Sequence, residues 1–280
     1  MNKYFVIFLV VILTCIGYLL IGSYLCESGS PESWESDINC YVFAYGSLVN
    51  DNSMSSTLFS LNLPDQNIET LEKIIPNSSL ISDSIQLENS YIPCRVKGIK
   101  REWNFVNRNS SLNPISKSPL YLGADFNDDS YTCNGVLIPI SGSQLDLLDQ
   151  RESGYTKKEI EINRIFIIGT DSGKTLLPNK KVYFYANQTG NKPLNNENPI
   201  VQSYVDTVLN GFISIDNKLK NNDFEFSKEF ISSTYGWDNR WINDRIYPYR
   251  PFIFVSNATV INKILKDVLG ENIINKIETY

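Results

Sequence analysis

Glu152 is the strongest candidate for acid–base chemistry, because the chain of 280 residues contains no histidine. That absence excludes Ser–His and Cys–His nucleophile pairs, histidine metal sites and histidine proton shuttles. Proton transfer near neutral pH then falls to a carboxylate with a raised pKa, ahead of Lys, Tyr or Cys. We expect Glu152 to end a helix, where the negative end of the dipole disfavours ionisation and burial raises the pKa further. The alternative is an exposed acid at a helix end, beside Asp146 and Asp149.

A short loop made of Tyr45, Gly46, Ser47 and Leu48 is the second candidate element of a site. It follows an aromatic, β-favouring run at 41–45, so we expect it at the end of a buried strand. Gly46 lets the backbone approach a ligand closely, and backbone N–H groups at a strand end can bind a carboxylate or a developing oxyanion. For Tyr45 the alternative is an ordinary core aromatic that only shapes the pocket.

The composition argues against several classes of partner. The five cysteines show no CxxC spacing, so we expect no metal site, and nothing in the chain indicates a cofactor. The net charge of −6, the isoelectric point near 4.9 and the lack of a basic stripe argue against nucleic acid. Four of the cysteines could form two disulfides in an oxidising compartment or remain free thiols. These four are Cys26, Cys40, Cys94 and Cys133.

An uncharged apolar stretch at 4–22 predicts a membrane-spanning signal anchor or a cleaved signal peptide, ahead of a buried soluble helix. Lys3 precedes the stretch and acidic residues follow it, so we expect the remainder to be lumenal or extracellular, or secreted after cleavage. The sequons at Asn77, Asn109, Asn187 and Asn257 carry no weight, since a chain this rich in Asn, Ser and Thr contains that many by chance.

The elements that must position the candidate residues form a pattern typical of an α+β fold with a mostly antiparallel or mixed sheet. We expect a helix over 141–152, with Ser141 or Ser143 as N-cap and Gly154 just past its end as a C-cap. An insertion within 52–89 carries one short helix near 68–75. Strands are expected at 41–45, 95–106, 120–126, 134–140, 158–168 and 181–186; helices at 199–209, 224–233 and 260–277; and irregular backbone at 237–254.

Five segments of the chain form a recognisable series. They are VFAYGSL (42–48), GIKREW (98–103), NGVLIPI (134–140), LLDQRESGY (147–155) and VYFYA (182–186). Together they resemble the gamma-glutamylcyclotransferase-like family, over roughly residues 42–186. In that family an aromatic strand runs into a Tyr-Gly-Ser-Leu loop, and a glutamate at a helix end follows further along the chain. The Arg-Glu-Ser-Gly-Tyr context also resembles the ChaC-type branch, whereas Val49 and Asn50 depart from it.

The resemblance implies a small closed or nearly closed β-barrel with flanking helices. It also implies an enzyme that needs no metal or cofactor: the α-amine of a γ-glutamyl peptide, amino acid or amine attacks its own γ-carbonyl, giving 5-oxoproline and a free amine. Glu152 would serve as general base and acid, and Tyr45, Gly46, Ser47 and Leu48 would bind the substrate. The sequence does not choose among glutathione, other γ-glutamyl peptides and γ-glutamyl-lysine.

The resulting organisation is an anchor or signal at 1–22, a tether at 23–40, the enzyme-like domain at 41–190 with an insertion at about 52–92, and a helical extension at 191–280 packing on it. The alternative function is a non-catalytic ligand-binding or interaction module of the same fold at the membrane. A third, weaker alternative is a structural membrane protein. Asp244 and Arg245 could form a substrate rim or belong to a packed tail.

Overall fold

The computed structural model describes residues 38–58, 91–106, 118–169, 176, 178–188, 198–219, 225–248 and 257–279. The chain divides into two units, Met1–Ile38 and Asn39–Tyr280, and the second holds every element described below. The apolar stretch at 4–22 and the helix expected near 68–75 lie outside the described residues. Within the described ranges, no helix is both long and apolar enough to cross a membrane.

The first sheet contains the strand from which the candidate loop emerges. Its order is β6-β8-β1-β5-β2-β7, so β1 lies inside the sheet, antiparallel to β5 and parallel to β8. Every residue of β1 is buried, as its apolar run predicts. The strands are β1 (Cys40–Ala44), β2 (Ile92–Lys97), β5 (Thr132–Ile140), β6 (Tyr155–Ile160), β7 (Ile165–Ile167) and β8 (Lys181–Asn187).

The second sheet is built mainly on one long antiparallel pair, β3 and β4, and its order is β10-β3-β4-β9-β11-β12. The short strands beside this pair come from the C-terminal part of the chain and pair in parallel. The strands are β3 (Ile99–Val106), β4 (Leu120–Phe126), β9 (Ile200–Val201), β10 (Thr234–Tyr235), β11 (Trp241–Asn243) and β12 (Glu278–Thr279).

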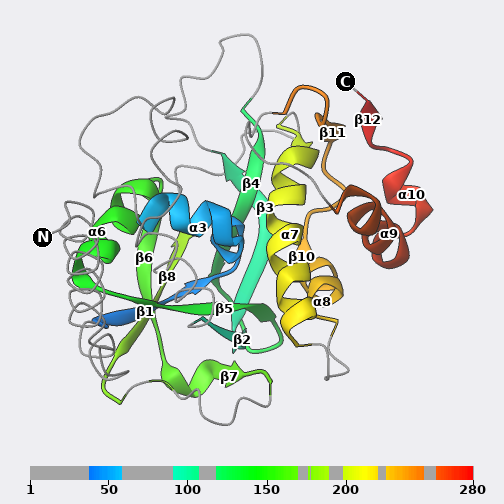
Figure 1. The fold of residues 1–280 in the computed structure, drawn as a ribbon. Coiled ribbons are helices and arrows are strands. Elements are labelled where there is room, and N and C mark those ends of the chain that lie inside the picture. Colours follow the sequence, from blue (N-terminus) through cyan, green and yellow to red (C-terminus); the bar gives the residue numbers. More distant parts are fainter. Residues whose placement is uncertain are drawn as a thin grey trace, which may run out of the picture. The chain divides into compact units, whose positions relative to one another are not determined.

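Figure 1 shows the helices in two groups: α3 and α6 lie together near β1, whereas α7 and α8 lie together beside β3 and β10. α7 is buried along most of its length, and α9 packs on α7 and α8. The helices are α3 (Asp51–Leu58), α6 (Gly142–Arg151), α7 (Gln202–Lys218), α8 (Phe226–Ser232), α9 (Ala258–Leu269) and α10 (Glu271–Ile274), with the 3-10 turns η1 (Ser47–Val49) and η3 (Ile162–Arg164).

The α+β class and the mixed sheet are confirmed, but the closed barrel is wrong, because neither sheet closes on itself within the described residues. The strand expected over 95–106 is in fact two strands. Gly98, with φ of 80°, turns the chain between β2 and β3, and this left-handed conformation favours glycine. β2 then pairs in the first sheet and β3 in the second, so one continuous ladder cannot form.

The helix that ends next to Glu152 forms as expected at its start and differs at its end. Ser141 accepts a hydrogen bond from the Gln144 N–H, and the Gln144 side chain accepts one from the Ser141 N–H, completing a capping box. The C-cap is Glu152 itself, with φ of −92° and ψ of 24°, and not Gly154. No left-handed glycine is needed, because the Glu152 carbonyl already accepts the Tyr155 N–H that begins β6.

Three cysteines lie in the first sheet as buried free thiols. Cys94 and Cys133 are fully buried and Cys40 is 3% exposed, and burial raises the pKa of each thiol. Of the two alternatives for the cysteines, the described residues therefore show free thiols. Cys15 and Cys26 lie outside the described residues.

The close approach of β1 and β5 yields the first prediction. A side chain at Gly135 would overlap the Ala44 carbonyl oxygen and lie 2.7 Å from a ring carbon of Phe43. We expect Gly135→Ala to lower the free energy of unfolding by about 1–3 kcal/mol, the usual cost of overpacking, measured by urea denaturation. Gly142→Ala is the matched control, because its nearest neighbour would be 3.8 Å away. Equal stability of the two variants would contradict this packing.

Candidate active site

The carboxylate at the end of α6 and the candidate loop are joined through one guanidinium group. Arg151 Nε lies 3.0 Å from Glu152 Oε1, and Arg151 Nη2 donates to Ser47 Oγ over 3.2 Å. The side chain of Glu152 is only 15% exposed, so this ion pair is largely shielded from water. The structure thus brings Glu152 and Ser47 into one region, although 105 positions separate them in the sequence.

Arg151 also fixes the helix that follows the loop. Its Nη1 donates to the Ser53 carbonyl over 2.7 Å and to Thr57 Oγ1, and its Nη2 donates to Ser53 Oγ over 3.0 Å. The planar guanidinium directs its donors in fixed directions, so it orients α3, the loop and Glu152 relative to one another. Sequence analysis gave this residue no role; its place next to Glu152 was the available signal.

Three tyrosines of the first sheet and its loop lie near enough to the Glu152 carboxylate for its charge to act on them. Tyr45 donates to the Tyr185 carbonyl over 2.6 Å, and Tyr155 donates to the Leu122 carbonyl over 3.0 Å. Burial is the main cause that raises the pKa of Tyr45, Tyr155 and Tyr185, and the negative charge of Glu152 adds to it in all three. These tyrosines therefore stay protonated and act as hydrogen-bond donors at neutral pH.

Side chains from the helix α7 and from the strand β4 of the second sheet lie next to the candidate loop. The ring of Tyr204 packs edge-on against Trp103 and Tyr121. A methyl group placed on Gly46 would lie 3.4 Å from the Tyr204 hydroxyl and 3.7 Å from Leu122. Those distances are ordinary contacts, so the surrounding protein alone does not require a glycine at this position.

The backbone of the loop offers donors that the protein does not use. Val49 N–H donates to the Gly46 carbonyl over 3.0 Å, and Asn50 N–H to the Ser47 carbonyl over 3.1 Å, which forms η1. Within the described residues, the N–H groups of Gly46, Ser47 and Leu48 have no hydrogen-bond acceptor. Ser47 and Leu48 are buried and Gly46 is partly buried, so the surrounding protein shields these residues from bulk water.

The structure also places Tyr185, Asp244 and Arg245, for which sequence analysis left alternatives. Tyr185 is 5% exposed and its hydroxyl donates to Asp149, so it is a packed aromatic with a polar partner near the end of α6. Asp244 accepts from the N–H and hydroxyl of Ser203, and Arg245 pairs with the buried Asp206, so both brace α7. Sequence analysis missed Tyr155 and Tyr204 as members of the cluster, although Tyr155 stands inside the quoted RESGY segment.

Among the residues described here, no three acidic or cysteine side chains gather in a group that could hold a metal ion. The cluster consists instead of the paired Glu152 and Arg151, buried tyrosines, one of which donates to Asp149, and backbone donors. Such a set can move a proton at Glu152 and stabilise a developing negative charge at the loop.

No protein-family model matches the chain, and no curated protein matches it. Among solved structures, it is similar to a gamma-glutamyl cyclotransferase, with 14% identity over 81% of this chain and 98% of the other and a TM-score of 0.42. It is also similar to an uncharacterized protein from Homo sapiens, with 15% identity over 81% of this chain and 98% of the other and a TM-score of 0.40. A third similar structure is a gamma-glutamyl cyclotransferase specific to glutathione, from yeast, with 12% identity over 69% of this chain and 94% of the other and a TM-score of 0.36. At such identities and TM-scores, no activity follows for this chain.

The buried tyrosines predict an alkaline limit to stability. A tyrosine whose pKa is raised by folding binds its proton more tightly in the folded state. Above the unfolded pKa of about 10, the unfolded chain therefore holds fewer protons and the free energy of unfolding falls, by about 1.4 kcal/mol per pH unit for each such tyrosine. We expect urea unfolding between pH 9 and 11 to show this fall, with a smaller slope for Tyr45→Phe.

Tyr247→Phe is the control for this experiment, because that side chain is 78% exposed. It should leave the slope unchanged. An identical slope for Tyr45→Phe and the unsubstituted protein would contradict the burial described for Tyr45.

Proposed function

We propose that this chain is a gamma-glutamylcyclotransferase. One observation carries the proposal: the Glu152 carboxylate at the end of α6 is linked through Arg151 to the loop that begins at Tyr45. These elements come from the two segments, VFAYGSL and LLDQRESGY, that most strongly resemble the family. The chemistry of the cluster suits a reaction that needs one proton carrier and several donors, and no metal.

In the proposed reaction, Glu152 first takes a proton from the α-ammonium of the γ-glutamyl group. The freed amine attacks the γ-carbonyl carbon of the same molecule, which forms the ring C–N bond and places negative charge on the oxygen. Collapse of this intermediate breaks the original amide bond, and Glu152 returns its proton to the departing nitrogen. The ring nitrogen, which still carries an extra proton from the attacking amine, loses that proton by way of Glu152 to the released amine, which leaves as an ammonium group. Ring closure supplies proximity, so the protein need not form a covalent intermediate.

The loop supplies the donors for this reaction. The N–H groups of Gly46, Ser47 and Leu48 are unused by the described protein residues, and they sit where a strand end gives way to a turn. We assign them to the substrate carboxylate and to the oxyanion, which prearranged donors in a shielded site stabilise strongly. Tyr45 shapes the site, since its own hydroxyl is already committed to the Tyr185 carbonyl.

Arg151 bears on the protonation of Glu152. A base must be ionised before it can accept a proton, and a guanidinium 3.0 Å from the carboxylate favours the ionised form. Burial and the helix end, which sequence analysis stressed, act in the opposite direction. The ion pair lets a shielded carboxylate start the cycle as a base.

The test is release of 5-oxoproline from glutathione, γ-glutamyl-lysine and simple γ-glutamyl amino acids. We expect Glu152→Gln to lower kcat by about 10²–10⁴, because the amide cannot carry the proton. Asp146→Asn is the matched control, since Asp146 is an exposed acid on the same helix, and it should keep full activity. Equal rates for Glu152→Gln and the unsubstituted protein, or no turnover of any substrate, would contradict the proposed function.

The alternative function, a binding module without turnover, predicts that γ-glutamyl compounds bind without release of 5-oxoproline. Retention of Glu152 and of its ion pair favours the enzyme, because a module that only binds has no need of a proton carrier. Calorimetric titration beside the activity assay separates the two.

We also propose that the stretch at 4–22 anchors the chain with its domain on the lumenal or outer side, or directs its secretion. The support is the apolar length and the acidic residues that follow it. In a eukaryotic secretory host, we expect a loss of mass on glycosidase treatment, which Asn187→Gln should not alter. The Asn187 side-chain nitrogen donates to Asn104 inside the fold, so it is poorly placed to carry a glycan. An unglycosylated cytosolic product would contradict this placement.

A further inference from the structure

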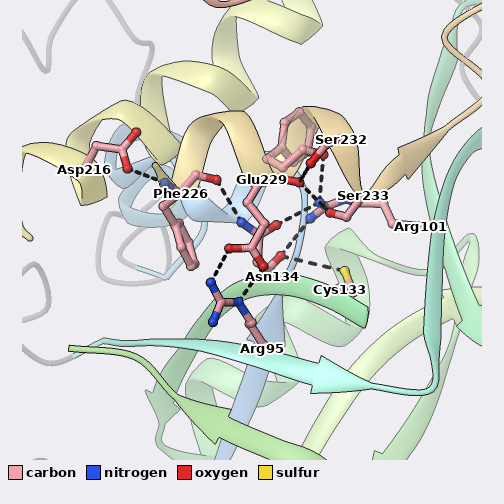
Figure 2. Close-up of polar contacts among 10 residues, drawn as sticks. Arg95, Arg101, Cys133, Asn134, Asp216, Phe226, Glu229, Ser232 and Ser233 are labelled. Carbon is pink, nitrogen blue, oxygen red and sulfur yellow. Dashed lines mark hydrogen bonds and ion pairs between the residues drawn. The ribbon is translucent and has the colours of Figure 1, made fainter. Parts of the chain in front are cut away.

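Arg101 is a buried cation that contacts no carboxylate among the residues that the structure describes. Its side chain is 0% exposed, and its guanidinium donates six hydrogen bonds, all to uncharged oxygens. Figure 2 shows the contacts with Asn134 and Ser233. The distances run from 2.7 to 3.2 Å. The acceptors are Thr234 Oγ1, the Tyr45 carbonyl, the Asn134 carbonyl, Asn134 Oδ1, the Phe230 carbonyl and Ser233 Oγ.

The charge of Arg101 is therefore solvated by the protein rather than cancelled. Burial lowers the pKa of Arg101, yet arginine remains protonated in proteins. The neighbouring carboxylate, Glu229, is bound by Arg95 through contacts of 2.5 and 2.7 Å. The Phe230 ring centroid lies 4.3 Å from the guanidinium carbon and adds a cation–π contact. Burying a charged arginine costs desolvation free energy, so we expect its contacts to serve a function.

One of these contacts reaches the candidate site. Arg101 Nη1 donates to the Tyr45 carbonyl over 3.2 Å. In a trans peptide the C=O and the following N–H point in opposite directions, so holding the Tyr45 carbonyl also fixes the direction of the Gly46 N–H. A hydrogen bond from a cation further polarises the peptide group and makes that N–H a stronger donor.

The other contacts anchor Arg101 to the C-terminal part of the chain. Phe230 lies in α8, Ser233 is the C-cap of that helix, and Thr234 begins the strand β10 that follows it. The helix is itself fixed at its start, where Asp216 accepts the Phe226 N–H over 2.6 Å and Asn134 donates to the Phe226 carbonyl over 2.8 Å. Figure 2 shows the guanidinium between α8 and β5.

We propose that Arg101 is a positioning residue: held by α8 and β10, it orients the Tyr45–Gly46 peptide so that the Gly46 N–H faces the substrate. This rests on the proposed function, and it gives the segment 226–235 a role in catalysis without contact to the substrate. α8 and β10 would then act as the clamp, and Arg101 as its link to the loop.

The test compares Arg101→Lys with Arg95→Lys. Both arginines contact α8, but only Arg101 contacts the loop. A lysine keeps the charge and cannot reach Tyr45 and α8 together. Loss of one oxyanion donor costs 10²–10³ in kcat, and a misdirected donor should cost about tenfold or more, with a smaller change in KM. We therefore expect kcat to fall about tenfold or more in Arg101→Lys. In Arg95→Lys we expect kcat to stay within about twofold of that of the unsubstituted protein, when each rate is divided by the fraction of folded protein.

The amide resonance of Gly46 gives a second readout that needs no turnover. In ¹⁵N NMR spectra it should move in Arg101→Lys and stay in place in Arg95→Lys. If the unsubstituted protein releases no 5-oxoproline, the proposed function fails, whereas a Gly46 resonance that moves only in Arg101→Lys still supports the positioning. A resonance that does not move, or that moves equally in both variants, overturns it.

Should Arg101→Lys fail to fold, the double variant Ser233→Ala/Thr234→Val removes two acceptors from the clamp and leaves Arg101 in place. We expect the Gly46 resonance to move and kcat to fall about three- to tenfold, less than a lost donor costs. A double variant that loses stability but keeps kcat per folded molecule and an unmoved Gly46 resonance would show that α8 has only a structural role.

Discussion

The guanidinium of Arg101 is the constraint on which the arrangement of the two sheets depends. It projects from β3 in the second sheet, and its hydrogen bonds reach Tyr45, just past the end of β1, and Asn134, near the start of β5, in the first. A fully buried cation must have its donors satisfied, or the folded state pays a large desolvation cost. The two sheets and α8 therefore have to meet at the positions that place oxygens around this group.

The candidate loop is consequently held from two sides by arginines with different environments. Arg101 binds the carbonyl at its start and has only neutral partners, so its charge acts on the peptide group it contacts. Arg151 binds Ser47 Oγ and pairs with Glu152, so its positive charge is largely neutralised by the carboxylate. The backbone between these two contacts has little freedom, which is what a prearranged set of donors requires.

Local features of the fold could be predicted from the sequence, and non-local ones could not. The strand before Tyr45 and the helix capped by Ser141 follow from side-chain periodicity and capping chemistry, which act within a few residues. The turn at Gly98 shows the limit: an unbroken pattern of strand-forming residues hides a change of sheet, because pairing depends on distant partners. The same holds for α3, whose place follows from contacts with Arg151 that no local pattern shows.

The site was predictable to the same extent. Glu152 and the loop could be singled out because the chain lacks histidine and because two short segments resemble a family. The groups that support them, Arg101 and Tyr204, come from a strand and a helix whose sequences carry no sign of a site. Arginine and tyrosine are common, and only the fold shows that these two are buried beside the loop.

The protonation states around Glu152 decide which group can carry a proton. Burial keeps Tyr45, Tyr155 and Tyr185 protonated, so none of them can act as a base near neutral pH. Arg151 cannot give up its proton, and it stabilises the carboxylate beside it. Among these side chains Glu152 is the one carboxylate, and it is the group to which the proposed function assigns the proton. A site of this kind can bring a proton from one nitrogen to another, as an intramolecular cyclisation requires, without histidine.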